Sequence, residues 1–266
     1  MADVKLDNVT FSYPNGYRAV ENVNLEIKTG ECVAIIGQNG AGKTTTVKMM
    51  NGLNKPTEGN VFIGSMNTRD HTTAEISRTV GYVFQNPDDQ IFHSTVEAEI
   101  RYSPHAFKLP QEEEDRLVKK ALEMTGLEEH KEKSPFDLPL SMRKFVTIAA
   151  VIAMNTDVLV FDEPTAGQDL QGNAVLSDIL KQLQRENKTI ITISHDMEFV
   201  ASNFRRVIVM ADKHVISTGT PEEIFWDDDV LEKARLKQPY AARVLKALDV
   251  PGQSTTIDGV VEAILG

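Results

Sequence analysis

The chain has 266 residues, of which 41% are hydrophobic and 25% are charged, a composition typical of a globular protein with a sizeable core. Its formal net charge of −11 argues against a protein that binds nucleic acid. The single cysteine, Cys32, lies in an apolar run and excludes a disulfide or a cysteine-based zinc cluster within these residues, so we expect a buried thiol.

The sequence does not predict a membrane-spanning segment. The longest apolar run, VTIAAVIAM at 146–154, is well short of the roughly 20 residues that cross a bilayer. The first residues alternate like a strand and lack the apolar core of a signal peptide. We therefore expect a cytoplasmic protein in which any membrane role comes through a partner.

Strand patterns occur along most of the chain up to residue 219. Residues 4–11 and 59–64 alternate apolar and polar side chains, as strands with one exposed face do. Residues 205–219 contain two more strands separated by a turn. Four continuous apolar runs are typical of parallel strands that are buried on both faces. They lie at 32–37, 80–85, 158–163 and 189–195.

Charged helical segments replace the strands between residues 96 and 156, which predicts a helical subdomain inserted in an α/β domain. After Gly219 short acidic helices follow. The last of them places five apolar residues on one face. They are Ile257, Val260, Val261, Ile264 and Leu265. We expect an α/β domain at 1–219, with the helical subdomain at about 96–156, and a C-terminal helical extension at 220–266.

A glycine-rich motif follows the run at 32–37. Residues 37–44, GQNGAGKT, fit G-x-x-x-x-G-K-[ST] between a buried strand and a helical segment, the context that this phosphate-binding motif requires. Lys43 would reach the β- and γ-phosphates, and the Thr44 hydroxyl would bind Mg²⁺. A turn without a ligand is the weaker alternative. The residues expected to bind the nucleotide here are Gly37, Gln38, Asn39, Gly40, Ala41, Gly42, Lys43, Thr44 and Thr45.

The run VLVFDE at 158–163 complements this loop. Asp162 ends a buried strand and would place a carboxylate beside the magnesium ion, and Glu163 would act as general base on the attacking water. An acidic strand end without such a role is the alternative, but the loop independently predicts a strand of this kind. Together the two motifs predict a P-loop NTPase core of the α/β class with a mixed sheet.

In order and spacing, these motifs resemble the ATP-binding subunits of ABC transporters over residues 3 to about 219. The resemblance implies that Tyr13 stacks on adenine and that His195 contacts the γ-phosphate. It also implies that Gln85 binds magnesium and links the attacking water to the helical subdomain, as a catalytic residue. A core role for Tyr13 at a strand end is a serious alternative, and Tyr17 is a weaker candidate for stacking.

Four short segments narrow the resemblance to the ATPases of energy-coupling factor importers, which take up vitamins or cobalt and nickel ions. They are FQNPDDQIF at 84–92, SPF at 134–136, DEPTAG at 162–167 and GTPEEIF at 219–225. The resemblance implies Mg²⁺ as cofactor, ATP as substrate and a place at the cytoplasmic face of the cell membrane. It implies three partners, with no nucleic acid among them. They are a second ABC ATPase with an intact signature motif, a transmembrane coupling protein and a substrate-binding membrane subunit.

Two surfaces would meet these partners. In this family short helices of the transmembrane partner enter a groove near Gln85, which implies that Gln85, Gln90, Ile91 and Phe92 line that groove here. The family's C-terminal extension helps to hold two ATPases together, and residues 220–266 have a suitable length and apolar spacing. Helices that simply fold onto their own core are an equally weighted alternative for this extension.

The stretch DLPLSMRKF at 137–145 departs from the family pattern, which has the signature L-S-G-G-Q here. Ungapped alignment from residue 163 backwards places Leu138 at the signature leucine. Pro139, Leu140, Ser141 and Met142 then replace Ser-Gly-Gly-Gln. Proline offers neither a hydroxyl nor an N–H, and Leu140 adds a side chain where a phosphate needs close backbone approach. Each lost hydrogen bond to a charged group is worth roughly 1.5–3 kcal/mol.

An alignment that starts the signature at Leu140 requires a two-residue deletion inside a helix, and we reject it. Gln168 is a second departure, at a position where the family usually has leucine between the two subunits. A homodimer would contain two sites, each with an intact phosphate-binding loop facing an altered signature. A heterodimer with an intact-signature partner would contain one competent site, and the retained Glu163 favours this second arrangement. That site would be built from this chain's Lys43, Asp162, Glu163 and His195.

The function expected from the sequence is ATP binding and hydrolysis that energises uptake through an energy-coupling factor transporter. A regulatory or structural nucleotide-binding partner with little turnover is one alternative, which the stretch at 139–144 favours. A soluble ABC ATPase of translation or DNA repair is another. Such proteins usually carry two cassettes or a long inserted arm, and neither is found in this sequence.

Overall fold

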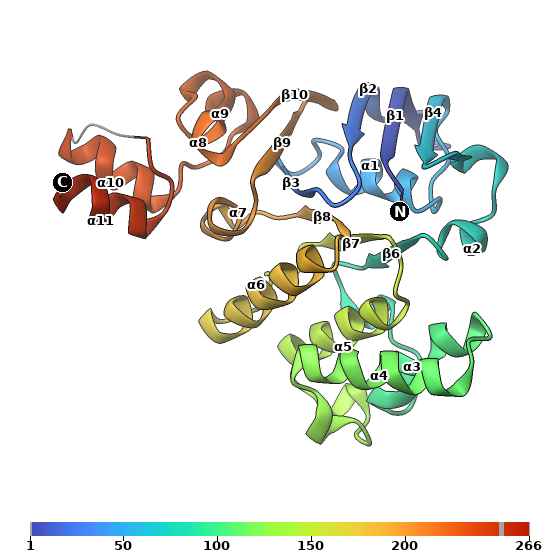
Figure 1. Cartoon of the computed structure of the whole chain (residues 1–266). Helices are drawn as coiled ribbons and strands as arrows, with labels where there is room; N and C mark the ends of the chain where they lie inside the picture. Colours follow the sequence, from blue (N-terminus) through green and yellow to red (C-terminus); the bar gives the residue numbers. More distant parts are fainter. Residues whose placement is uncertain (1, 250–252, 266) are drawn as a thin grey trace.

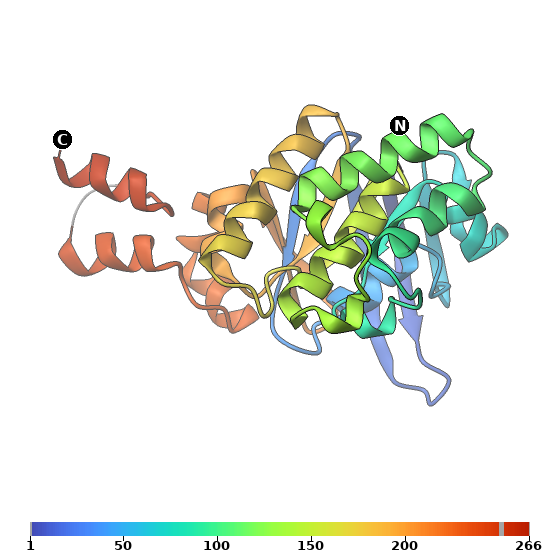
Figure 2. The same ribbon diagram turned by 90° about the horizontal axis from the view of Figure 1, so that it is seen from below.

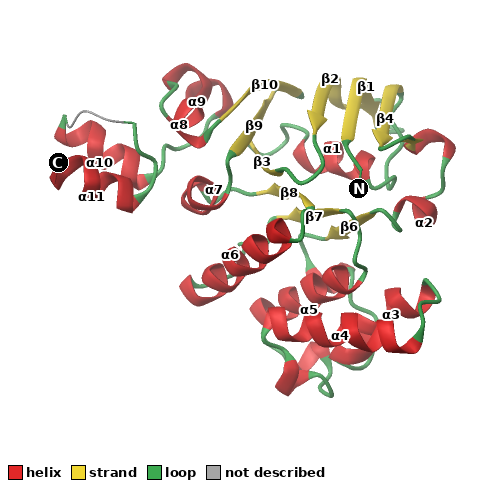
Figure 3. Ribbon diagram, viewed as in Figure 1, coloured by secondary structure: helices red, strands yellow, loops and turns green. Residues whose placement is uncertain are grey.

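Two β-sheets form the core of the computed structural model, which describes residues 2–249 and 253–265. The larger sheet has the strand order β10-β9-β3-β8-β7-β6, and the smaller one β2-β1-β4-β5. Figure 3 shows the strands together, with the helices α3 to α6 on one side of them. The strands are β1 Val4–Ser12, β2 Arg18–Ile27, β3 Cys32–Ile36, β4 Glu58–Ile63, β5 Met66–Asn67, β6 Val80–Val83, β7 Val158–Asp162, β8 Thr189–Ile193, β9 Arg206–Ala211 and β10 His214–Gly219.

The larger sheet is mixed, as the sequence predicts. Strands β6, β7, β8, β3 and β9 pair in parallel, and β10 pairs antiparallel to β9. The four continuous apolar runs are β3, β6, β7 and β8, and their side chains are almost all buried. Because β3, β7 and β8 are parallel, the residues that follow them lie at one edge of the sheet. This edge carries Gly37, Glu163 and His195.

The smaller sheet is antiparallel and lies beside the larger one (Figure 1). Its strand β2 is absent from the elements expected above, although alternate residues of β2 are buried against β1. One buried apolar cluster joins this sheet, the helix α1 (Lys43–Met50) and one face of the larger sheet. The first helix is therefore held between the two sheets, with its N-terminus at the edge that carries Gly37.

The segment after β6 contains three helices that pack together below the larger sheet in Figure 1. They are α3 Val96–Ala106, α4 Gln111–Thr125 and α5 Leu140–Ala153. Helix α5 is almost entirely buried from Lys144 onwards, and it joins the helical segment to the sheet. The remaining helices of the core are α2 Thr73–Ile76, α6 Leu170–Arg185 and α7 Met197–Asn203.

The helices after residue 219 divide into two pairs. Helices α8 (Pro221–Phe225) and α9 (Asp228–Ala234) bury Phe225 and Leu231 in the main core cluster. Helices α10 (Tyr240–Leu248) and α11 (Ile257–Leu265) instead share a small cluster around Leu245 and Val260. Figures 1 and 2 both show this second pair at one end of the molecule, away from the sheets. The domain boundary that we expect after residue 219 stays a prediction.

Trp226 lies at the junction between these two pairs of helices. Its ring packs against the small cluster of α10 and α11, and its Nε1–H donates a hydrogen bond to the carbonyl of Ser254 at 3.4 Å. On α11 only Val260 of the expected apolar face is buried, whereas the other four apolar residues are exposed. In the part of the chain that the structure describes, no helix has both the length and the apolar character needed to cross a membrane.

Candidate active site

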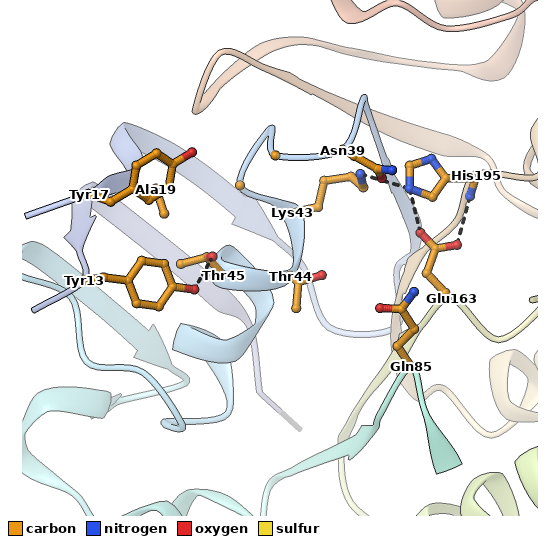
Figure 4. A pocket seen from close by; sticks show the side chains of 12 residues that line it. Tyr13, Tyr17, Ala19, Asn39, Lys43, Thr44, Thr45, Gln85, Glu163 and His195 are labelled. Atoms are coloured by element: carbon orange, nitrogen blue, oxygen red, sulfur yellow. Dashed lines mark hydrogen bonds and ion pairs between the residues drawn. The ribbon is translucent and has the colours of Figure 1, made fainter. Parts of the chain in front are cut away.

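A pocket of about 280 Å³ lies where α1, β6, β7 and β8 meet the smaller sheet (Figure 4). It brings together ten of the residues expected to bind or act on the nucleotide, and adds Tyr17 and Ala19. The ten are Tyr13, Asn39, Gly40, Gly42, Lys43, Thr44, Thr45, Gln85, Glu163 and His195. The other expected residues, Gly37, Gln38, Ala41 and Asp162, do not line it.

The loop before α1 takes a path that only glycine allows at two positions. Gly37 has φ 148° and Gly42 has φ 101°. A Cβ atom at Gly37 would lie 2.0 Å from the carbonyl oxygen of Met210, and one at Gly42 would lie 2.6 Å from that of Ala19. Among the described residues no side chain caps α1, and residues 42–45 at its N-terminus line the pocket. Such a helix terminus favours a bound anion.

Lys43 opens α1 and turns its ammonium back into the loop. Its Nζ donates hydrogen bonds to the carbonyls of Gly37 at 2.7 Å and Gln38 at 3.1 Å. Burial lowers the pKa of Lys43, and the charges of Glu163 and Asp162 oppose this shift. Entering phosphate oxygens would compete with the two carbonyls for a poorly hydrated cation, which favours strong binding of an anion.

Asp162 ends β7 below the first turn of α1. The hydroxyl of Thr44 donates to its Oδ1 at 3.4 Å, and the hydroxyl of Tyr82 donates to its Oδ2 at 2.7 Å. Burial, together with the charge of Asp162, raises the pKa of Tyr82, so this hydroxyl remains a donor. Sequence reasoning missed Tyr82, since its strand shows only an apolar pattern.

The oxygen atoms around Thr44 suit a magnesium ion. Mg²⁺ binds hard oxygen ligands and usually keeps several waters, so a protein supplies few of its ligands. Here the hydroxyl of Thr44 and a carboxylate oxygen of Asp162 are adjacent, and Gln85 lines the same pocket. The residues present therefore fit the cation that the sequence predicts.

Glu163 follows β7 in the left-handed region, with φ 53°, and is only 7% exposed. Its Oε2 accepts a hydrogen bond from the backbone N–H of His195 at 3.2 Å. Burial raises the pKa of Glu163, and the nearby charge of Lys43 opposes this shift. A carboxylate with a raised pKa is a stronger base, which suits removal of a proton from water.

His195 places its Nε2 between two charged groups. This atom lies 3.1 Å from Oε1 of Glu163 and 3.3 Å from Nζ of Lys43 (Figure 4). Burial lowers the pKa of His195, and the positive charge of Lys43 lowers it further. The imidazole is therefore neutral at pH 7. It can accept a hydrogen bond from Lys43 or donate one to Glu163, depending on its tautomer.

Two tyrosines form the opposite end of the pocket. The hydroxyl of Tyr13 lies 3.2 Å from that of Thr45, and its ring makes an edge contact with Phe11. The rings of Tyr13 and Tyr17 are separated by 6.4 Å between centroids and inclined by 21°. Both rings are partly exposed, so a flat ligand can reach them. Stacking of adenine at this end stays a prediction.

The altered signature stretch forms the beginning of α5. Leu138 is buried, Pro139 is the residue before the first helical turn, and Leu140 is 52% exposed. The carbonyl of Ser141 accepts a hydrogen bond from Nε2 of Gln168 at 3.0 Å. Leu140 therefore presents an apolar side chain at the terminus where the sequence resemblance expects a phosphate.

A second pocket, of about 220 Å³, lies between the sheet and the helical segment. Gln90 and Phe92 line it, and Phe92 is 61% exposed. Two of the four residues expected to line the groove do not line this pocket. Ile91 is buried in the main core cluster, and Gln85 faces the first pocket because it follows β6 at the edge that carries the phosphate-binding loop.

Comparison with known proteins adds independent information. The family model for ABC transporters matches residues 20–166. The energy-coupling factor transporter ATP-binding protein EcfA2 of Clostridium acetobutylicum is 40% identical, in an alignment that covers 98% of this chain and 96% of that protein. The corresponding protein EcfA of Methanocaldococcus jannaschii is 38% identical, over 92% and 89% of the two chains.

One relative is much longer. A putative ABC transporter ATP-binding protein of Methanosarcina mazei is 38% identical over 98% of this chain, which spans 44% of that protein. Among solved structures, cbiO1 of Clostridium perfringens, described as part of the ABC transporter complex cbiONQ, superposes with a TM-score of 0.77 and 33% identity. That match covers 91% of this chain and 98% of the other.

A second solved structure is the ATP-binding cassette MJ0796, a dimer in a post-hydrolysis state with ADP and phosphate bound. It has a TM-score of 0.75 and 31% identity, over 82% of this chain and 98% of that one. These similarities confirm the resemblance and the fold class that the sequence predicts. They do not assign the individual site residues, whose roles stay predictions.

Proposed function

We propose, from the premise that this chain belongs to the ABC transporter family of ATP-binding proteins, that it is the ATP-hydrolysing subunit of an energy-coupling factor importer. One observation carries the catalytic part of this proposal. A single pocket is lined by residues of the phosphate-binding loop, by Thr44, whose hydroxyl donates to Asp162, and by the buried Glu163 beside His195. The names of the relatives support the importer class.

The residues of the pocket account for hydrolysis as follows. The loop at 37–45 binds the phosphates of ATP, and Lys43 exchanges its carbonyl partners for phosphate oxygens. Thr44, Asp162 and Gln85 would hold Mg²⁺, which supplies charge neutralisation at the phosphates. Glu163 takes a proton from water while the water oxygen bonds to the γ-phosphorus. The bond to the β–γ bridging oxygen breaks, and ADP and phosphate leave.

His195 has two roles in this scheme. Its neutral imidazole contacts the γ-phosphate, and its backbone N–H fixes one oxygen of Glu163 at 3.2 Å. Tyr13 stacks on adenine at the far end of the pocket. Gln85 connects the nucleotide to the segment that leads towards the helices α3 to α5.

The partners in this proposal are a second ABC ATPase with an intact signature, a transmembrane coupling protein and a substrate-binding membrane subunit. The cargo is a vitamin or a transition-metal ion, and the chain lies at the cytoplasmic face of the membrane. Leu140 at the start of α5 supports a heterodimer, because it alters the signature half of the site. In a heterodimer the intact phosphate-binding loop of this chain would face the intact signature of the partner, and the two together would form one competent site.

The helix pair α10–α11 is the proposed contact between the two ATPases. Val244 and Leu248 on α10 and Val261 and Ile264 on α11 are 43–58% exposed although they are apolar. The pair packs on its own small cluster and leaves these side chains uncovered within this chain. An apolar surface of this kind is typical of an interface with another subunit.

The groove beside Phe92 provides the experiment that tests membrane coupling. We expect Phe92→Cys to cross-link to the transmembrane subunit in the purified complex. The native thiol will not interfere, because burial raises the pKa of Cys32 to about 12. Ile216→Cys is the control, since it lies on β10, at the sheet edge opposite to β6 and the groove. Cross-linking from residue 216 alone would refute this placement.

A regulatory nucleotide-binding subunit with little turnover remains a second candidate, and the substituted start of α5 favours it. Steady-state ATPase activity of the complex distinguishes the two. The enzyme proposal predicts that activity depends on Glu163, whereas the regulatory proposal predicts that it does not. A soluble ABC ATPase would purify without a membrane protein.

A further inference from the structure

A buried lysine connects α5 to the general base. Lys144 lies in the second turn of α5 and is only 3% exposed. Its Nζ donates hydrogen bonds to the backbone carbonyls of Glu163 at 2.8 Å and Ala166 at 3.3 Å. A buried cation is costly unless its hydrogen bonds are made, so these two acceptors define where this side chain can lie.

The carbonyl that Lys144 holds belongs to an unfavourable backbone conformation. Glu163 has φ 53°, a region that residues with a side chain seldom adopt. Its N–H donates to the carbonyl of Ile193 at 3.0 Å, and its own carbonyl accepts from Lys144. The two bonds hold the peptide groups on either side of the residue. They therefore set the direction in which the carboxylate of Glu163 leaves the chain.

A second bond ties the same loop to the first turn of α5. Gln168 donates its Nε2–H to the carbonyl of Ser141 at 3.0 Å. Lys144 and Gln168 thus join the beginning of α5 to both ends of the segment 163–168. A displacement of α5 relative to β7 would stretch these bonds and move the backbone of Glu163 with them.

We propose that Lys144 is a positioning residue for ATP hydrolysis, which holds the backbone of Glu163 so that the carboxylate faces the attacking water. The proposal rests on the role of Glu163 proposed above. A purely structural role would make the protein less stable when the lysine is replaced. Burial lowers the pKa of Lys144, so its charge is unfavourable for folding. An apolar side chain of similar shape would therefore not destabilise the protein through loss of charge.

The test uses the full chain in its purified complex and a matched pair of variants. Met and Gln side chains have the same length, but only Gln carries N–H donors. We expect Lys144→Met to lower kcat for ATP by up to about 10²-fold, the effect of a small misplacement of a catalytic group, with KM unchanged. Lys144→Gln should recover much of this loss. Equal kcat for the two variants would overturn the proposal.

A double-mutant cycle separates positioning from a general structural effect. If Lys144 acts through Glu163, then Lys144→Met should not reduce further the residual activity of Glu163→Gln. Losses that multiply in the double variant would show that the two residues act independently. Equal falls in kcat, ATP affinity and thermal midpoint for both single Lys144 variants would assign the lysine to the fold alone.

The outcomes also distinguish this inference from the proposed function. If Glu163→Gln retains activity, the role of Glu163 fails, whatever Lys144 does. If Glu163→Gln is inactive and Lys144→Met is fully active, only the positioning role fails. Should Lys144→Met not fold, Lys144→Arg replaces it. This variant keeps the charge but moves the donors, so kcat should fall with KM unchanged, and an unchanged kcat would contradict the proposal.

Discussion

The phosphate-binding loop and the start of α5 contrast sharply, although the resemblance places both at nucleotide sites. In the loop, Gly37 and Gly42 leave no room for a side chain, and Lys43 is held by two carbonyls. At α5, Pro139 and Leu140 are exposed. The loop carries the features needed to bind a phosphate closely, whereas the start of α5 lacks them.

The phosphate-binding half and the signature half of a nucleotide site lie on different elements of the chain. One half can therefore be kept while the other is altered. The phosphate-binding loop and Glu163 follow parallel strands of the larger sheet, and Asp162 ends one of these strands, so the strand ends hold these residues close together. The start of α5 belongs to the helical segment and meets the loop after β7 mainly through side-chain hydrogen bonds. Substitutions at 139–142 change neither Lys144 nor the backbone carbonyl at position 141, so both bonds to the loop after β7 can be kept.

The largest expected effect tests whether the two sites are unequal. Glu163→Gln should remove most ATP hydrolysis by the complex, since loss of a general base commonly costs about 10²–10⁴-fold. Mutation of the equivalent glutamate in the partner should cost much less, because the site that it serves is closed by Pro139 and Leu140. Steady-state ATPase activity of each single variant is the measurement. Equal losses of ATPase activity in the two single variants would contradict the proposed difference between the two sites.

A second variant tests the intact half directly. Lys43→Ala should weaken ATP binding at this chain's loop by roughly 10- to 100-fold, the value of a charge-assisted contact to phosphate. Binding of a fluorescent ATP analogue to the isolated chain measures this loss. Lys48→Ala is a matched control, because it removes a lysine from the last turn of the same helix, away from the pocket. Equal affinity for both variants would mean that the loop is misassigned.

The altered half can be repaired to sharpen the comparison. Restoring Ser-Gly-Gly-Gln at 139–142 should raise ATP turnover at the site that these residues close by up to about tenfold, the value of one hydrogen bond to a charged group. Total turnover of the complex should rise much less, because the other site already carries most of it. Transport should change little, since the competent site already drives it. Rates of ATP hydrolysis and uptake in reconstituted vesicles check both statements. A fall in turnover would show that the native Pro139 and Leu140 are required.

The smallest effect concerns pH. Because burial raises the pKa of Glu163, the base becomes protonated, and kcat falls, at a higher pH than the ordinary glutamate value of 4.5 would give. Because burial lowers the pKa of His195 below its ordinary value of 6.5, this residue stays neutral above pH 6.5, and its protonation should not lower kcat there. A pH–rate profile at saturating ATP tests this expectation. A limb at or below pH 4.5 would contradict it.

The sequence predicts much of the fold and of the candidate site for physical reasons. Continuous apolar runs identify β3, β6, β7 and β8, and parallel pairing brings the residues after β3, β7 and β8 to one edge. Strand β2 is harder to recognise, because Asn22 and Asn24 interrupt its apolar residues and Asn22 has a positive φ. The division into two sheets depends on long-range pairing that no local pattern contains.

Sequence reasoning missed Tyr82 and Lys144, which both form hydrogen bonds to residues far away in the sequence. Tyr82 lies 80 positions from its acceptor Asp162, and Lys144 lies 19 positions from Glu163, whose carbonyl it contacts. In the sequence Tyr82 resembles any aromatic residue of a buried strand, and Lys144 resembles a charge on a helix surface. Only the packing of α5 against β7 shows that this lysine is enclosed. Its one local signal is the continuous apolar run that follows it in α5.

The position of Trp226 has a practical consequence. It is the only tryptophan of the 266 residues, and it contacts the α10–α11 pair rather than the nucleotide pocket. Intrinsic fluorescence excited selectively at tryptophan will therefore come from this junction alone. A change in its emission on adding ATP to the purified chain would report that a pocket lined by tyrosines alters the packing of the C-terminal helices, without any attached label.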